Sequence, residues 1–378
     1  MGSAIGWHSS LYDPQLDPTR LLEMGAEREA AGDLHFAATA YEVALGREPG
    51  NPAAEAALGR VLDRLEIVEH GLRFRYVPGG RYLMGSETGD PDEQPVHAVE
   101  LPPFWLTDTP VTWTDYCRLM DWTPPPGGIP ESRRPSGEGF DPIVFGIRLS
   151  RQMRLQYCET EAQKAIDWHA HDPESIWMQR GEQKTAQELF GEPPRRNPRA
   201  PWTWDQKPMI AAGWEDAREL AARLAAPAVE YGLPTEAEWE KAARGGLAGR
   251  RYSWGDEPPT PERCDFDRWS EFSIRVPREL PPNRYGLYGM CGGVWEWTAD
   301  WYDAAYYRES PGWRPAGPEQ GEERVLRGGS WADSAEAVTV SFRMSRAPSG
   351  WRDRDAISHF TPNFGFRLAR RDPALSAL

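Results

Sequence analysis

Apolar and small residues recur at helical spacing through the first part of the chain, between residues 18 and 51. The pattern runs through Leu21, Met24, Gly25, Gly32, Ala37, Tyr41, Ala44 and Pro49. Residues 52–65 then repeat the spacing of the first helix, with Leu58-Gly59 in the place of Met24-Gly25. The sequence therefore predicts three helices within residues 18–70, preceded by a tail of residues 1–17.

These three helices fit one and a half tetratricopeptide-like repeats. Repeats of this kind bury an apolar face only by stacking, and so few of them are not stable alone. The helices must either pack on the rest of the chain or bind a partner protein. Packing is the interpretation we favour, because a peptide-binding groove usually needs several stacked repeats.

Strand patterns begin after residue 71. Residues 74–86 alternate apolar and polar side chains around a Pro-Gly-Gly turn, which predicts a β-hairpin. Residues 95–101 and 104–106 continue the strand pattern, and residues 112–120 change to helical spacing with Thr112 or Thr114 as the cap.

Helices and short irregular segments alternate in the second half of the chain. Residues 122–207 have the composition of an insertion, rich in Pro, Gly and Arg at both ends, with a predicted helix at 149–168. Two amphipathic helices are predicted at 213–224 and 234–243, the second opened by a Thr235–Glu238 capping box. Beyond them, Gly, Pro and Trp interrupt every pattern, which favours an irregular α+β domain.

Three sequence blocks carry a resemblance to a known family. They are residues 232–246 (Gly-Leu-Pro-Thr-Glu-Ala-Glu-Trp-Glu-Lys-Ala-Ala-Arg-Gly-Gly), 283–297 (Asn-Arg-Tyr-Gly-Leu-Tyr-Gly-Met-Cys-Gly-Gly-Val-Trp-Glu-Trp) and 324–331 (Arg-Val-Leu-Arg-Gly-Gly-Ser-Trp). In this order they resemble the formylglycine-generating-enzyme, or sulfatase-modifying-factor, family. The resemblance covers residues 71–372 and implies that family's irregular C-type-lectin-like α+β fold.

The chemistry of that family is missing from the matching positions. Its catalysis rests on a cysteine pair just after the Gly-Gly-Ser segment, which binds copper and oxidises a substrate cysteine. Asp333 and Val338 stand at those positions here and supply no thiolate. The four cysteines of this chain, Cys117, Cys158, Cys264 and Cys291, have no CxxC spacing and are expected to be reduced and mostly buried.

Two other metal sites follow from the resemblance. A branch of the fold holds iron with three histidines, but the seven histidines of this chain include no His-x-x-x-His pair. The family also binds calcium, and the corresponding ligands would be the carbonyls of Gly292 and Val294 and the carboxylate of Glu296. Gly289 and Gly293 stand where the family usually has Asn or Asp, so an ordinary hydrogen-bonded Glu296 is the alternative. His169 and His171 are a further candidate metal pair.

The charge and composition of the chain disfavour two classes of protein, those that bind nucleic acid and those that span a membrane. A formal net charge of -15 over 378 residues disfavours nucleic-acid binding. No stretch is long and apolar enough to span a bilayer, and the first residues lack a secretory pattern, so we expect a cytoplasmic protein without membrane contact. Lysine occurs at only four positions, and the arginine bias indicates a GC-rich, thermophilic source.

Residues 332–364 lie between two blocks that are core strands in the family, so they are expected to form an exposed binding face. Proteins diversified by retroelements use this scaffold and vary such a segment at template adenines. Mutated Asn codons then never give Lys, Glu, Gln, Met or Trp, and only Glu336, Met344 and Trp351 of this segment belong to that set. The predicted contact residues are Asp333, Ser334, Val338, Val340, Ser341, Ser345, Ser349, Asp353, Asp355, Ser358 and His359.

The sequence thus predicts a non-catalytic protein that needs no cofactor, with a calcium ion as the alternative at the site above. It would bind an unknown macromolecular ligand at the C-terminal face, and the N-terminal helices are a second candidate surface for a protein partner. Arg343, Arg346 and Arg367 are expected to brace the scaffold by pairing with carboxylates. The alternative is a metal-dependent oxidative or protein-modifying enzyme of the same superfamily.

Overall fold

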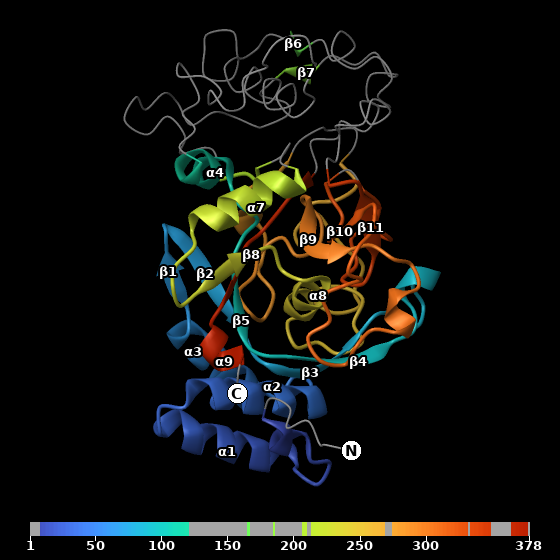
Figure 1. The fold of residues 1–378 in the computed structure, drawn as a ribbon. Helices are drawn as coiled ribbons and strands as arrows, with labels where there is room; N and C mark the ends of the chain where they lie inside the picture. Colours follow the sequence, from blue (N-terminus) through green and yellow to red (C-terminus); the bar gives the residue numbers. More distant parts are fainter. Residues whose placement is uncertain are drawn as a thin grey trace.

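The computed structural model describes residues 8–120, 165–166, 184–185, 206–209, 213–268, 274–331, 333–348 and 364–376. The predicted helix at 149–168 falls almost entirely outside these residues. No helix among the described residues has both the length and the apolar character needed to cross a membrane. Figure 1 shows the fold, with the N-terminal helices at one end of the molecule.

The three N-terminal helices form as predicted. They are α1 (Pro18–Ala30), α2 (Leu34–Arg47) and α3 (Pro52–Arg64), preceded by the short helix η1 (Ser9–Tyr12). Each begins with an acidic or amide N-cap, and the Asp17 carboxylate accepts a hydrogen bond from the Arg20 N–H at 2.7 Å. Glu29 of α1 pairs with Arg60 and Arg64 of α3, and this ties the first helix to the third. Their tetratricopeptide-like character stays a prediction.

These helices pack against the rest of the chain. Six consecutive residues of α2, from Phe36 to Tyr41, are buried, so the helix is covered on more than one side. His35 of α2 and the Tyr76 hydroxyl lie 2.9 Å apart, and the Trp105 indole donates to the Leu65 carbonyl at 2.8 Å. In Figure 1, α2 lies between α1 and the remainder of the molecule.

A five-stranded antiparallel sheet receives the N-terminal helices. Its order is β1-β2-β5-β13-β8. The strands are β1 (Ile67–Glu69), β2 (Leu72–Val77), β5 (Phe104–Thr107), β8 (Glu230–Gly232) and β13 (Ala369–Arg371). The last strand therefore lies in the middle of a sheet built mostly from the first third of the domain.

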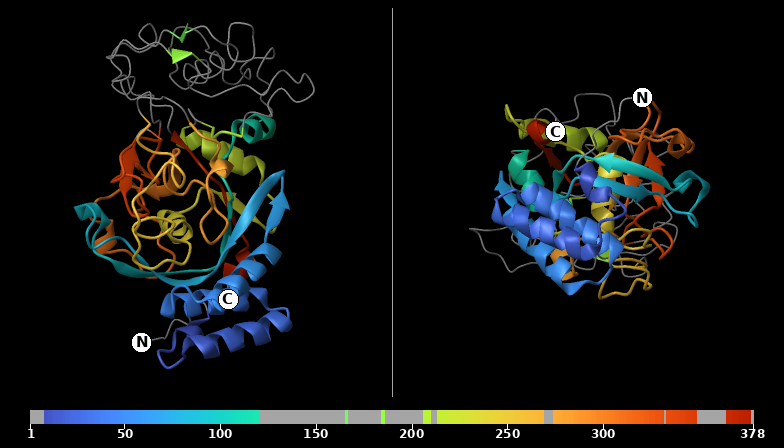
Figure 2. Two further views of the ribbon diagram at one scale, coloured as in Figure 1. Left: turned by 180° about the vertical axis from the view of Figure 1, so that it is seen from behind. Right: turned by 90° about the horizontal axis from the view of Figure 1, so that it is seen from below.

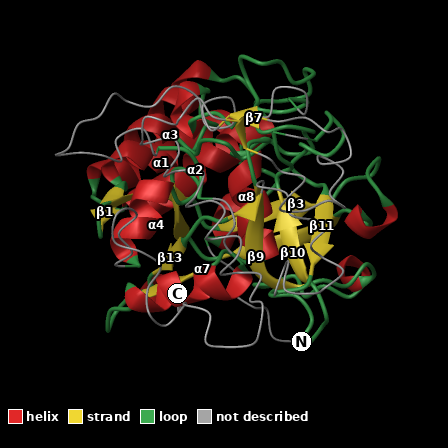
Figure 3. Cartoon of the chain, turned by 90° about the horizontal axis from the view of Figure 1, so that it is seen from above, coloured by secondary structure: helices red, strands yellow, loops and turns green. Residues whose placement is uncertain are grey.

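A second sheet has the order β11-β10-β9-β12, and only β12 runs parallel to its neighbour. Its strands are β9 (Trp295–Trp301), β10 (Arg324–Arg327), β11 (Arg343–Arg346) and β12 (Phe364–Gly365). Seen from the end opposite α1–α3, β9, β10 and β11 lie side by side (Figure 3). The other elements are β6 (Ala165–Ile166), β7 (Lys184–Thr185), η2 (Pro91–Glu93), η5 (Pro277–Glu279), η6 (Tyr306–Arg308) and α9 (Pro373–Ser376).

The predicted hairpin at residues 74–86 is wrong in its pairing. Both strands form, but β2 pairs with β1 and β5, whereas β3 (Gly80–Met84) pairs with β4 (His97–Leu101). Gly80 has a φ of 126°, which turns the chain out of the first sheet instead of back along β2. β3 and β4 then form a curved ribbon along the side of the molecule above the N-terminal helices (Figure 2).

Three of the predicted helices of the domain are present, as α4 (Trp113–Leu119), α7 (Trp214–Arg223) and α8 (Glu236–Arg244). The capping box of α8 is confirmed, since the Glu238 N–H donates to the Thr235 hydroxyl and the Thr235 N–H donates to the Glu238 carboxylate. All nine residues of α8 are buried, and the helix contacts β3, β9 and β10. It forms the centre of the domain.

Val111 joins three parts of the chain at the far end of the molecule. Its N–H donates to the Phe366 carbonyl at 2.8 Å, and its carbonyl accepts from the Met209 N–H at 2.7 Å. Gly365 lies in the same place, where an added Cβ would be 2.9 Å from the Met209 carbonyl oxygen. The chain thus leaves for residues 121–205 and returns from residues 349–363 beside one pinned junction.

Candidate functional site

A tight turn after β10 carries the first candidate residues. Gly328 and Gly329 have φ values of 100° and 70°, and an added Cβ on Gly329 would lie 2.7 Å from the Ala337 carbonyl oxygen. Only glycine suits such backbone. The turn brings Ser330 back over Asp333, whose carboxylate accepts hydrogen bonds from the Ser330 N–H at 2.9 Å and from its hydroxyl.

Asp333 is held from several sides. The Trp295 indole at the start of β9 also donates to its carboxylate, and its main-chain carbonyl accepts from the Asp267 N–H at 2.8 Å. Burial raises the pKa of Asp333, and the hydrogen bonds from Ser330 and Trp295 oppose that shift without reversing it. The side chain is therefore a fixed, partly exposed oxygen acceptor at the beginning of the predicted binding segment.

The remaining predicted contact residues fall into three groups. Ser334 is exposed and Ser345 is half-buried, so a ligand can reach both. Val338 and Val340 have 0% exposure, which contradicts their assignment as surface contacts, whereas Ser341 is 6% exposed and lines the cleft described next. The two valine side chains belong to the buried hydrophobic core. The other predicted contacts, Ser349, Asp353, Asp355, Ser358 and His359, lie outside the described residues.

A cleft of about 710 Å³ lies beside this segment. Glu336, Thr339, Ser341 and Phe342 form one wall. The turn between β3 and β4 forms the opposite wall, where the Gly85 carbonyl accepts a hydrogen bond from Arg244 at 2.8 Å. These partners could not be predicted from the sequence, because the contact between Arg244 and Gly85 joins residues 159 positions apart.

Basic residues complete the cleft. Arg250 pairs with Asp256 at 2.5 Å, and Arg251 lies over the ring of Tyr252 with 5.6 Å to its centroid. Glu336 and Asp256 contribute carboxylates to the same cleft. The cleft next to the C-terminal segment is thus lined by both basic and acidic side chains.

Comparison with known proteins places this architecture. The model of the family described as "Sulfatase-modifying factor enzyme 1-like domain" matches residues 71–372. The chain belongs to this family. The formylglycine-generating enzyme of Streptomyces coelicolor is 31% identical over 353 residues, covering 88% of this chain and 96% of the relative.

A second relative and a solved structure are also similar to this chain. The mouse protein named inactive C-alpha-formylglycine-generating enzyme 2 is 29% identical over 322 residues, covering 78% of this chain and 84% of that protein. The structure of PvdO from Pseudomonas aeruginosa superposes with a TM-score of 0.50 at 21% identity, covering 80% of this chain and 95% of that one. The mixed α+β fold predicted from the sequence is therefore confirmed.

The copper site of the sulfatase-modifying-factor family does not fit these residues. Asp333 offers hard carboxylate oxygens and Val338 offers no donor atom, whereas copper(I) prefers soft thiolates. Cys264 and Cys291 are free and buried, as predicted, and the Cys264 thiol lies 3.1 Å from the Cys291 carbonyl oxygen. Burial raises the pKa of Cys291 to about 11 and that of Cys264 well above its usual value, so both remain thiols at neutral pH.

The calcium site also does not fit. Glu296 is completely buried, and Arg367 donates to both of its oxygens at 2.6 and 2.7 Å. The Trp239 indole donates a third hydrogen bond at 2.7 Å. A guanidinium group therefore occupies the place of a cation beside this carboxylate, which corrects the assignment of Gly292, Val294 and Glu296. His169 and His171, the remaining metal candidates, lie outside the described residues.

Proposed function

We propose that this chain is a non-catalytic member of the sulfatase-modifying-factor family that binds a macromolecular ligand through its C-terminal face. Residues 333–337, the outer part of β11 and the adjoining cleft would contact that ligand. The proposal further holds that a retroelement diversifies this segment.

The observation that carries the proposal is the donor set at the catalytic positions. A side chain that accepts three hydrogen bonds and a buried valine replace the two thiols, and the surrounding scaffold is intact. A relative named as inactive indicates that family members without catalysis occur. Selection for the scaffold without its catalyst is best explained by binding.

The burial of individual side chains indicates which positions of the segment can vary. Val338 and Val340 belong to the core, and Arg343 is fixed to Glu236 by a hydrogen bond of 2.7 Å. Changes at these three positions would leave a cavity or an unpaired buried charge. Variation is therefore expected at residues 333–337 and 345–363, and residues 338–344 should stay constant.

The test is deep sequencing of codons 325–370 from a population of the source cells. We expect substitutions at template adenines, concentrated in codons 333–337 and 345–363, with codons 338, 340 and 343 unchanged. Codons 283–297, which encode the Glu296 block, serve as the invariant control. A uniform sequence across all these codons would refute diversification and would favour the metal-dependent alternative, to be followed by metal analysis of the purified protein.

A further inference from the structure

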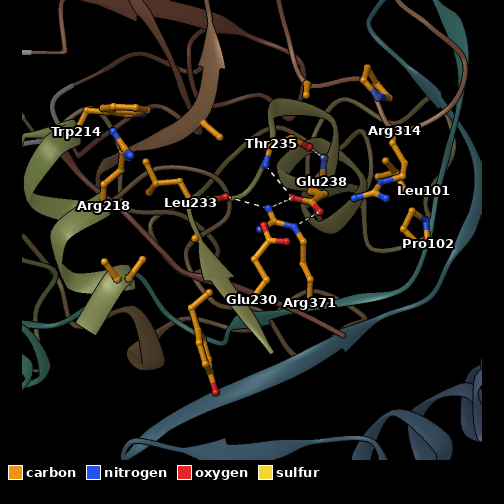
Figure 4. Close-up of a pocket in the computed structure, with 17 residues that line it drawn as sticks. Leu101, Pro102, Trp214, Arg218, Glu230, Leu233, Thr235, Glu238, Arg314 and Arg371 are labelled. Carbon is orange, nitrogen blue, oxygen red and sulfur yellow. Dashed lines mark hydrogen bonds and ion pairs between the residues drawn. The ribbon is translucent and has the colours of Figure 1, made fainter. Parts of the chain in front are cut away.

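A second cavity, of about 460 Å³, lies on a different part of the domain from the cleft described above, with which it shares no lining residue. It is open to solvent on one side and is lined by α7, β8, the first turn of α8 and residues 314–316 (Figure 4). This volume lies within the range of cavities that hold small organic ligands.

Arg371 and the carboxylates that neutralise its charge form the floor of this cavity. Arg371 of β13 donates to the Glu238 carboxylate at 2.7 and 2.5 Å and to the Leu233 carbonyl at 2.9 Å. Glu230 approaches the same guanidinium at 3.1 Å. The two carboxylates therefore neutralise the charge of Arg371. Because two glutamates face one arginine, the net charge of the floor is negative.

Arg314, whose side chain is exposed, lines the cavity on the opposite side. It forms no ion pair with any residue that the structure describes, and its guanidinium reaches toward the centre of the cavity (Figure 4). Its backbone has a φ of 48°, and its N–H donates to the Glu100 carbonyl at 3.0 Å. A non-glycine residue held in this region is strained, and such strain is concentrated at functional sites.

The other walls combine one more cation with apolar surface. Arg218 of α7 lies over the Trp214 ring, 4.9 Å from its centroid, and its pairing with Glu215 at 3.6 Å is between exposed groups and therefore weak. Leu101, Pro102 and Leu233 contribute apolar atoms to the lining, with Leu101 and Pro102 on the side of Arg314 (Figure 4). An anion with an apolar body matches both features.

We propose that this cavity binds a small organic monocarboxylate, whose carboxylate pairs with Arg314 while its apolar body packs against Leu101 and Leu233. Glu230 and Glu238 on the same lining would repel a doubly charged phosphate, and they select a singly charged group. Binding here is independent of the C-terminal face, since the two cavities have separate linings.

The probe is 4-methylpentanoate, titrated calorimetrically into the full chain, with 4-methylpentan-1-ol and inorganic phosphate as comparison ligands. We expect saturable binding of the acid alone. The variant is Arg314→Gly, because glycine adopts the local backbone without strain and removes only the guanidinium. Its thermal unfolding temperature should equal or exceed that of the parent chain, while affinity for the acid falls at least about tenfold.

Arg308→Ala is the matched control, since Arg308 is an exposed arginine on η6 that does not line this cavity, and it should leave affinity unchanged. Equal binding of the acid by Arg314→Gly overturns the proposal, as does the absence of saturable binding by the parent chain up to about 10 mM acid. Tighter binding of phosphate than of the acid would overturn the assigned ligand class.

Discussion

Asp333 occupies the position where the family places its first catalytic thiol, and its environment is adapted to oxygen. Ser330 and Trp295 donate hydrogen bonds to it, which are contacts that a carboxylate uses well and a thiolate uses poorly. Its pKa is raised by burial. Carboxylates are also weak ligands for copper(I).

This arrangement predicts an inactive protein in the family reaction. Incubated with copper and a cysteine peptide that the Streptomyces coelicolor enzyme converts, this chain should give no formylglycine above background by mass spectrometry. The Streptomyces enzyme in parallel is the positive control. Turnover that requires copper and this chain would contradict the interpretation of Asp333 and Val338.

Several single-residue interpretations could be made from sequence and others could not. Arg343 and Arg367 were expected to pair with carboxylates, and both do, with Glu236 and Glu296. Their partners could not be named, because the pairs join residues 107 and 71 positions apart. Arg346 differs, because it forms no ion pair with the described residues and donates to the Ser345 carbonyl at 2.8 Å instead.

At the scale of elements, α8 acts as the central connector of the domain. Each of its three glutamates binds an arginine from a different strand: Glu236 pairs with Arg343 of β11, Glu238 with Arg371 of β13, and Glu240 with Arg327 of β10. Both Glu240 and Arg327 are completely buried. Removing one member would leave the other as an uncompensated buried charge.

Glu240→Ala should lower the free energy of unfolding by about 3–5 kcal/mol. The control is Glu219→Ala on α7, which breaks an exposed pair with Arg223 and should cost less than about 1 kcal/mol. Chemical denaturation of both variants measures the difference. Equal losses would mean that the buried network contributes no more than a surface pair.

The same buried network predicts that the stability of the protein decreases at low pH. Burial acts to raise the pKa of Glu240, but Arg244 and Arg327 outweigh it and hold that pKa below its usual value. A lowered folded pKa contributes stability that is present above the unfolded value of about 4.3 and is lost as the pH falls through the folded value. The stability difference between parent and Glu240→Ala should therefore shrink below about pH 4.

The sequence patterns predict helices and strands whose contacts are local. They do not predict the pairing of strands that are distant in the sequence. The capping box at Thr235 and Glu238 identified the start of α8, because both partners lie within one turn. Alternation identified β2 and β3 as strands. It could not show that they belong to different sheets, since the partners of β2 and β3 lie beyond the turn that joins them.

At the scale of the whole molecule, the N-terminal helices and the domain share one core. Residues of α2 and of β2 belong to the same buried cluster, and Glu55 of α3 pairs with Arg284 at 2.7 Å. The helices therefore depend on a surface that the domain supplies.

Residues 8–66 expressed alone should be largely unfolded by circular dichroism, whereas the full chain should unfold in one cooperative transition that includes them. A helix with buried residues on several sides loses most of its stabilising contacts when its neighbours are removed. A cooperative thermal transition of the isolated fragment would show instead that the three helices are an independent unit.

The junction at Val111 has a consequence for how this molecule can change. Because Met209 and Phe366 are both hydrogen-bonded to Val111, the scaffold is closed before the chain departs for residues 121–205 and after it returns from residues 349–363. Segments of other lengths and compositions can therefore be exchanged next to this junction, which makes the protein a frame for grafting foreign recognition sequences.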